Sequence, residues 1–99
     1  MAESETRDGY RLLHTMIRVL DLERSIAFYC DHLGMKLLHR TDYAGGKFTN
    51  AFVGYGDEAT DAVVELTHNW EQAEPYDKGN GFGHLAVSVP DIYATCEAL

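Results

Sequence analysis

The stretch of sequence that decides the fold occurs twice in this 99-residue chain. Its two versions, seventy residues apart, are His14-Thr15-Met16-Ile17-Arg18-Val19-Leu20-Asp21 and His84-Leu85-Ala86-Val87-Ser88-Val89-Pro90-Asp91. In each version a histidine opens an apolar run rich in β-branched residues, and an aspartate closes it. Ser25 also has a counterpart in Thr95. Self-similarity at a constant spacing indicates a duplicated unit, here a strand followed by a helix.

The residues that follow the first copy predict one complete module. A strand is expected over 12–19, and Asp21 is a suitable N-cap for the amphipathic helix that follows. Gly34 stands where a left-handed residue ends such a helix. Three more strands are expected over 36–43, 48–55 and 62–68, and a loop is expected over 69–83.

The second copy begins near Phe82, and the chain ends at Leu99, within the first turns of the helix expected there. We therefore expect a single domain over residues 11–99. It comprises a complete module over 11–69, a linker loop over 70–81 and an incomplete second module over 82–99. Residues 1–10 are mostly polar and are expected to form a disordered tail.

Composition and charge exclude several classes of protein. Eight Lys and Arg against sixteen Asp and Glu give a net charge of −8, which argues against binding to nucleic acid or to an anionic membrane surface. The hydrophobic fraction of 45% is sufficient for a core, but no apolar run approaches the length of a membrane span. Two cysteines without a CxxC motif and the lack of a signal peptide predict a cytoplasmic protein with free thiols.

Three residues are candidate metal ligands. His14 and His84 occupy equivalent positions of the repeat, and Glu65 lies within an apolar strand where an unpaired carboxylate is costly to bury. Taken singly, each is more often a core or surface residue. Together, on strands expected to line one sheet, two imidazoles and a carboxylate form a ligand set that divalent first-row metals favour. The repeat also predicts a counterpart of Glu65 beyond Leu99.

Arg18 and Asn69 are candidates for binding a ligand next to this site. Arg18 shares its strand face with His14, and a guanidinium can hold a carboxylate through two hydrogen bonds. Asn69 could donate and accept hydrogen bonds at the same place. Alternatively, Arg18 is a solvated cation at the strand end, and Asn69 is a turn residue. The remaining histidines are expected at the surface; they are His32, His39 and His68. Three aromatic residues could either line a pocket or cover the core; they are Trp70, Tyr76 and Phe82.

Several segments, in order and with their spacing, carry a family resemblance. They are Leu12-Leu13-His14-Thr15-Met16-Ile17-Arg18-Val19, Arg24-Ser25-Ile26-Ala27-Phe28-Tyr29, Leu33-Gly34-Met35-Lys36-Leu37-Leu38, Ala51-Phe52-Val53-Gly54-Tyr55-Gly56, Val64-Glu65-Leu66-Thr67-His68-Asn69-Trp70 and Gly83-His84-Leu85-Ala86-Val87-Ser88-Val89. Together they resemble the glyoxalase I family (lactoylglutathione lyases) of the vicinal oxygen chelate superfamily.

The resemblance implies an α+β fold of paired βαβββ modules and a homodimer whose active sites form between modules of different subunits. It implies methylglyoxal detoxification, by isomerisation of the glutathione–methylglyoxal hemithioacetal to S-lactoylglutathione through general base catalysis and Lewis-acid stabilisation. His14, Glu65 and His84 match metal ligands of the family, and Arg18 and Asn69 match positions that hold glutathione. His14, where some members have glutamine, and the short loop before Ala62 favour Ni²⁺ or Co²⁺ over Zn²⁺.

The chain also departs from the family pattern. The fourth ligand, which is the main catalytic base of the family, has no position before Leu99, so Glu65 is the one matched carboxylate left to act as a base. The second-module cations that bind glutathione are also absent, and Asn80 replaces an arginine found in some members. We therefore expect a lactoylglutathione lyase sequence that is truncated and poorly active alone.

Two alternatives stay open. The first is a non-catalytic module of the same superfamily that binds a metal or a small molecule. The second is another metal enzyme, such as an extradiol dioxygenase, which the detailed match over 65–70 disfavours.

Overall fold

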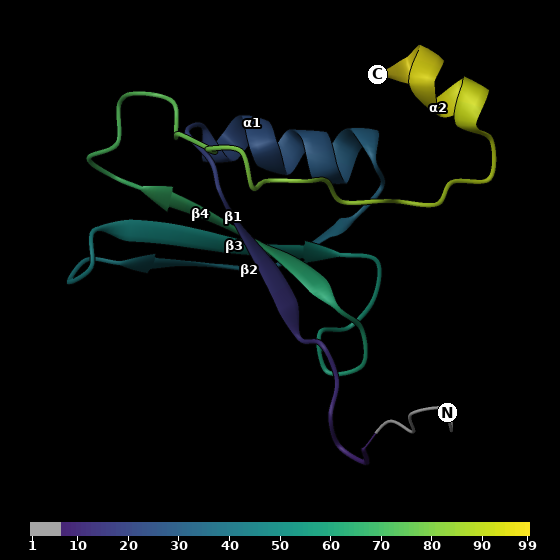
Figure 1. The fold of residues 1–99 in the computed structure, drawn as a ribbon, viewed down its shortest axis with the longest axis horizontal. Helices are drawn as coiled ribbons and strands as arrows, with labels where there is room; N and C mark the ends of the chain where they lie inside the picture. Colours follow the sequence, from purple (N-terminus) through teal and green to yellow (C-terminus); the bar gives the residue numbers. More distant parts are fainter. Residues whose placement is uncertain (1–6) are drawn as a thin grey trace.

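The computed structural model describes residues 7–99 and contains one four-stranded sheet (Figure 1). Its strands are ordered β1 (His14–Arg18), β4 (Val63–Asn69), β3 (Phe48–Gly54) and β2 (Lys36–Tyr43). The β1 strand is parallel to β4, and the other neighbours are antiparallel. The order along the chain is strand, helix, strand, strand, strand, which confirms the predicted α+β module.

The helix between β1 and β2 begins and ends where the sequence predicts. It consists of α1 (Leu22–Ala27), which continues into a π-helical turn, η1 (Phe28–His32). The Asp21 side chain caps its start by accepting a hydrogen bond of 3.0 Å from the backbone N–H of Arg24. Gly34 follows its end with φ = +73°, a left-handed conformation that glycine adopts without steric cost.

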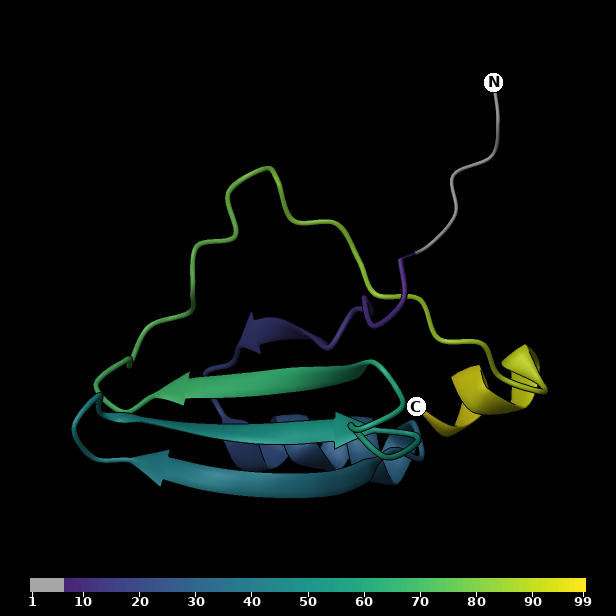
Figure 2. The same ribbon diagram turned by 90° about the horizontal axis from the view of Figure 1, so that it is seen from below.

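The core lies between α1 and one face of the sheet. Leu22 of the helix packs against Ala51, Val53 and Leu66, which are fully buried on β3 and β4. Figure 2 shows α1 behind the sheet, while the opposite sheet face carries no helix. We call this opposite surface the open face. It positions the candidate site.

The expected strand over 12–19 is shorter in the structure, because β1 extends only from His14 to Arg18. Leu12 and Leu13 are exposed, at 70% and 54% of their surface. The reason is pairing: β4, the only neighbour of β1 among the described residues, begins at Val63, which is in register with His14. Before His14, the Leu13 carbonyl still accepts a hydrogen bond of 3.1 Å from the backbone N–H of Val63, whereas Arg11 and Leu12 lie beyond the start of β4. The expected limits of β3 and β4 are correct to within one residue.

In the second copy, the predicted helix forms and the predicted strand does not. Asp91 caps α2 (Ile92–Ala98) by accepting hydrogen bonds from the N–H groups of Tyr93 and Ala94. Residues 84–89, however, are not a strand, so this expectation is wrong. A strand needs a neighbour to pair its N–H and C=O groups, and no strand of the described chain pairs with this segment.

The predicted tail over 1–10 can be followed only in part. Residues 1–6 lie outside the described residues, and 7–10 contain a turn and are exposed. Residues 70–81 carry no helix or strand, as expected for a linker. No helix within residues 7–99 is long and apolar enough to cross a membrane.

Both cysteines are free thiols, as predicted. Cys96 is exposed, and Cys30 is half-buried at the core side of η1. Burial raises the pKa of the Cys30 thiol, and the negative charge of Asp31 raises it further. Burial also raises the pKa of the neighbouring Tyr29. A raised pKa lowers the thiolate fraction, so Cys30 is a packing residue rather than an activated nucleophile.

Candidate functional site

The open face collects polar side chains from all four strands. In the strand register, Met16 pairs with Glu65, Glu65 with Phe52, and Phe52 with His39. Because paired residues point to the same side of a sheet, these side chains form one row across the open face. The next row contains Arg18, Thr67, Asn50 and Thr41.

Two of the three predicted metal ligands meet on this face. The Nε2 atom of His14 lies 3.1 Å from Oε1 of Glu65. The Glu65 side chain is mostly buried, with 16% of its surface exposed, whereas that of His14 is 40% exposed. The imidazole thus separates the carboxylate from solvent on one side while staying accessible itself.

The other carboxylate oxygen of Glu65 is held by two donors. The Thr67 hydroxyl donates to Oε2 at 2.9 Å, and the Asn50 amide donates to Oε2 at 3.4 Å. Asn50 is buried, and its own Oδ1 has no partner within residues 7–99. A buried acceptor without a partner costs about 1–3 kcal/mol, so the sheet keeps this amide at the expense of stability.

An aromatic contact extends the site toward β2. Phe52 makes an edge-to-face contact with His14, with ring centroids 5.3 Å apart, and stacks on His39 at 4.4 Å. His39 also pairs with Glu58, their side-chain atoms 2.9 Å apart. His39 and His32 are exposed as expected, but His68 is half-buried, with Nδ1 3.3 Å from the Val19 carbonyl.

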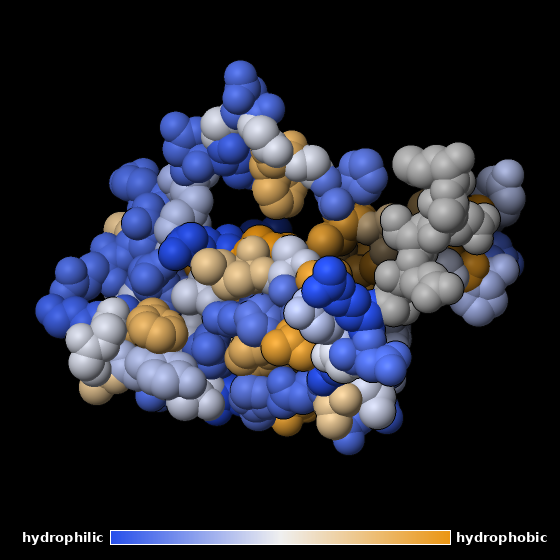
Figure 3. Space-filling model, turned by 60° about the horizontal axis from the view of Figure 1, so that its bottom comes forward, coloured by the Kyte–Doolittle hydropathy of each residue, from blue (hydrophilic) through white to orange (hydrophobic). Residues whose placement is uncertain are grey.

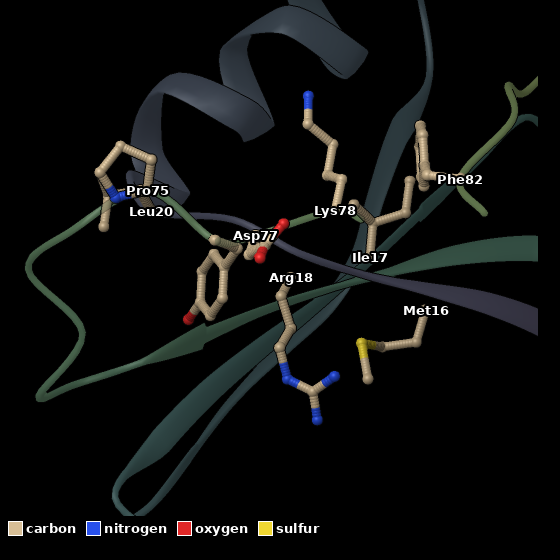
Figure 4. Close-up of a pocket in the computed structure, with 9 residues that line it drawn as sticks. Met16, Ile17, Arg18, Leu20, Pro75, Asp77, Lys78 and Phe82 are labelled. Carbon is tan, nitrogen blue, oxygen red and sulfur yellow. The ribbon is translucent and has the colours of Figure 1, made fainter. Parts of the chain in front are cut away.

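Arg18 lines an open pocket of about 590 Å³ between β1 and the loop over 75–82. In Figure 4 the side chains of Arg18 and Met16 extend to one side of β1, whereas Ile17 of β1 and Lys78 of the loop lie on the other side. The pocket therefore wraps around the free edge of the sheet. Figure 3 shows hydrophobic side chains in the hollow beneath this loop.

Asn69 lies at the end of β4 on the open face, as expected from its spacing to Glu65. Its Oδ1 accepts a hydrogen bond of 3.0 Å from the Tyr76 hydroxyl, which ties the loop to the sheet. Tyr76 and Phe82 line the pocket, as the sequence suggested, whereas the Trp70 indole donates to the Thr49 hydroxyl at 2.8 Å. A ligand that binds Asn69 through this amide has to compete with Tyr76.

His84 does not join His14 and Glu65 within this chain. It lines a different pocket, of about 390 Å³, together with Ile17 and Phe28. Ile17 points to the helix side of β1, opposite to His14. The expectation that all three residues line one sheet is therefore wrong for His84, because the segment that carries it is not part of the sheet. No group of three or more potential metal ligands forms within residues 7–99.

The donor set that does form fits part of a metal site. An imidazole nitrogen and a carboxylate oxygen, both directed into the same space, suit Ni²⁺, Co²⁺ or Zn²⁺. The direct contact between them brings the two side chains to one place on the open face. Further ligands would have to come from elsewhere, since a metal site normally needs at least three protein ligands.

Sequence reasoning missed three residues of the open face, which are Asn50, Phe52 and Thr67. Thr67 could have been found, because it follows Glu65 by two residues and so shares its strand face. Asn50 and Phe52 lie on another strand, and their proximity to Glu65 depends on the register between β3 and β4. Nothing within either strand alone indicates that register.

Comparison with known proteins places these observations in context. The model of the Glyoxalase/Bleomycin resistance protein/Dioxygenase superfamily matches residues 11–99. A probable lactoylglutathione lyase of Synechocystis sp. is 62% identical over 88 residues, covering 89% of this chain and 66% of the relative. A lactoylglutathione lyase of Neisseria meningitidis serogroup A is 62% identical over 87 residues, covering 88% and 62%. The chain thus spans just under two thirds of these relatives.

Solved structures agree with the fold. The trypanothione-dependent glyoxalase I of Leishmania major superposes with a TM-score of 0.84 at 44% identity, over 90% of this chain and 63% of that one. Glyoxalase I from Zea mays superposes with a TM-score of 0.84 at 46% identity, over 89% of this chain and 31% of that one.

Proposed function

This chain belongs to the Glyoxalase/Bleomycin resistance protein/Dioxygenase superfamily, and we propose from this premise that its open face contributes to a lactoylglutathione lyase site. The reaction is the metal-dependent isomerisation of the glutathione–methylglyoxal hemithioacetal to S-lactoylglutathione. The observation that carries the proposal is the contact between His14 Nε2 and Glu65 Oε1 at 3.1 Å, on the face that also presents Arg18 and Asn69. The names of the curated relatives support the same activity.

In this proposal each residue has a distinct role. His14 and Glu65 hold a divalent cation, which supplies Lewis-acid stabilisation of negative charge on the substrate oxygens when bound. Glu65 is also the carboxylate of this site that would accept a proton from the substrate. Arg18 holds a carboxylate of the glutathione moiety, and Asn69 hydrogen-bonds to its peptide groups. Ni²⁺ or Co²⁺ is favoured over Zn²⁺.

His84 completes the site from a second copy of the chain. Within one chain it lies on the helix side of β1, away from the open face. A homodimer in which each open face receives the partner's 82–99 segment reconciles this position with a role as a ligand. Exposed apolar residues on the segment, including Phe82, Ile92 and Tyr93, suit burial between copies.

The shared site can be tested by mixing two variants that each lack one of the two histidine ligands. His14→Ala and His84→Ala are each expected to bind Co²⁺ weakly, measured by competition with a chromophoric chelator. In a mixed dimer one site keeps both histidines, so mixing the two chains restores tight binding. If the mixture binds as weakly as its components, the ligands of one site do not come from two chains.

Activity is tested by following hemithioacetal isomerisation in ultraviolet absorbance. Metal-free protein is titrated separately with Ni²⁺, Co²⁺ and Zn²⁺, using hemithioacetals of glutathione and of trypanothione. Turnover with one metal that is lost in Glu65→Gln supports the proposed lyase and identifies the thiol.

A non-catalytic binding module of the same superfamily is the second candidate. It is favoured by the observation that only two of the three candidate metal ligands meet among the described residues. Tight binding of metal and S-alkylglutathione without any turnover would select this function.

We also expect a cytoplasmic location, which the two free thiols support.

A further inference from the structure

Asn50 is a buried polar residue at a position where an apolar residue would pack without loss. It lies in the middle of β3 on the open face, with 7% of its surface exposed. Its amide donates to Oε2 of Glu65, and its Oδ1 is buried without a partner among the described residues. A leucine there would fill similar space and leave no acceptor unpaired. Stability therefore does not account for this asparagine.

The hydrogen bonds of Glu65 make its two oxygens unequal. Oε2 accepts from Thr67 of its own strand and from Asn50 of the neighbouring strand, at 2.9 Å and 3.4 Å. Oε1 faces His14 at 3.1 Å. The terminal torsion of a glutamate is otherwise soft, so its carboxylate rotates easily. Donors from two strands oppose that rotation in a way that one donor cannot.

We propose that Asn50 is a positioning residue that holds Oε2 of Glu65, so that only Oε1 binds the cation beside His14. This inference rests on the proposed metal site. Binding through one oxygen rather than two leaves room around the cation for a ligand or substrate. The amide thus contributes to geometry and affinity through Glu65 without touching the metal.

The test uses Asn50→Leu in the full 99-residue chain. Co²⁺ affinity is measured by chelator competition, the visible absorption of the Co²⁺ protein is recorded, and the unfolding midpoint is measured without metal. Removal of such supporting contacts typically weakens metal binding about 10-fold to 100-fold. We expect a loss of this size and a changed Co²⁺ spectrum, together with an unchanged or higher unfolding midpoint. The Co²⁺ affinity thus falls while the stability of the folded chain does not.

Thr41→Val provides the matched control. Thr41 is in register with Asn50 on β2 and is not among the donors to Glu65. Its Co²⁺ affinity and spectrum are expected to match those of the unmodified chain. Asn50→Ala supplies the same binding readouts if the leucine variant does not fold, because it adds no volume.

The outcomes separate this inference from the proposed site. If Glu65→Gln weakens Co²⁺ binding but Asn50→Leu changes neither affinity nor spectrum, the positioning role is refuted and the site stands. If Glu65→Gln also leaves affinity unchanged, both are refuted. A lower unfolding midpoint of Asn50→Leu with unaltered Co²⁺ binding would make Asn50 a structural residue.

Discussion

At the scale of single residues, the open face depends on pairs that lie on different strands. Glu65 contacts His14 of β1, Thr67 of its own strand and Asn50 of β3. The candidate ligands themselves were recognisable because histidine and glutamate are rare within apolar strands. The supporting residue on the neighbouring strand was not, since asparagine in a strand has many ordinary roles and its contact with Glu65 depends on the register of β3 against β4. A chemically distinctive residue can be found from sequence, whereas a residue that supports it from another strand cannot.

Arg18 provides a prediction at this scale. Arg18→Ala is expected to weaken binding of an S-alkylglutathione about 10-fold to 100-fold, because charge-assisted hydrogen bonds contribute about 1.5–3 kcal/mol. Isothermal titration calorimetry measures the loss. Arg40→Ala is the control, since Arg40 pairs with Glu23 of the helix on the other side of the sheet. Equal affinity of Arg18→Ala and the unmodified chain would refute the assignment.

At the scale of elements, the two repeats have the same local signals and different outcomes. Asp21 and Asp91 both cap helices, as their equivalent positions predict. The runs after His14 and His84 differ, since only the first pairs with another strand. A helix satisfies its backbone hydrogen bonds within its own segment, but a strand requires a partner. Local sequence predicted two helices and two strands, and both helices but only one of the two strands formed.

The two caps support a matched stability prediction. Asp21→Ala is expected to lower the free energy of unfolding by about 1 kcal/mol, because α1 is packed on the core through Leu22. Asp91→Ala is expected to have a smaller effect, because α2 has no buried residue. Urea unfolding followed by circular dichroism compares the two variants. Equal losses would indicate that α2 contributes to the folded state as much as α1 does.

At the scale of the whole molecule, charge and exposed apolar surface act against each other. The chain carries a net charge of −8, so two copies repel. Exposed residues such as Phe82, Ile92 and Tyr93 favour association. The proposed homodimer needs the apolar contribution to exceed the repulsion.

This balance predicts how salt affects association. Raising NaCl from about 20 to about 300 mM shortens the screening length and is expected to lower the dimer dissociation constant. Analytical ultracentrifugation over a range of protein concentrations measures the constant at each salt level. A dissociation constant that rises with salt would contradict this prediction, since it would mean that ion pairs rather than apolar contacts hold the copies together.

The sequence by itself determined the features that depend on neighbouring residues. These are the order of strands and helices in the first module, the caps at Asp21 and Asp91, the turn at Gly34, and the candidate roles of His14 and Glu65. All follow from periodicity, capping and residue chemistry over a few positions.

Only the tertiary structure decided which of these residues meet. The register of β3 against β4 brings Asn50 to Glu65, and the parallel pairing of β1 with β4 brings His14 there. The path of the chain after the linker leaves His84 on the other side of β1. Register and chain path arise from contacts between segments far apart in sequence, and a slip of one residue would turn each side chain of a strand to the opposite face. This is why the candidate ligands could be listed from the sequence, whereas the site around them could not be assembled from it.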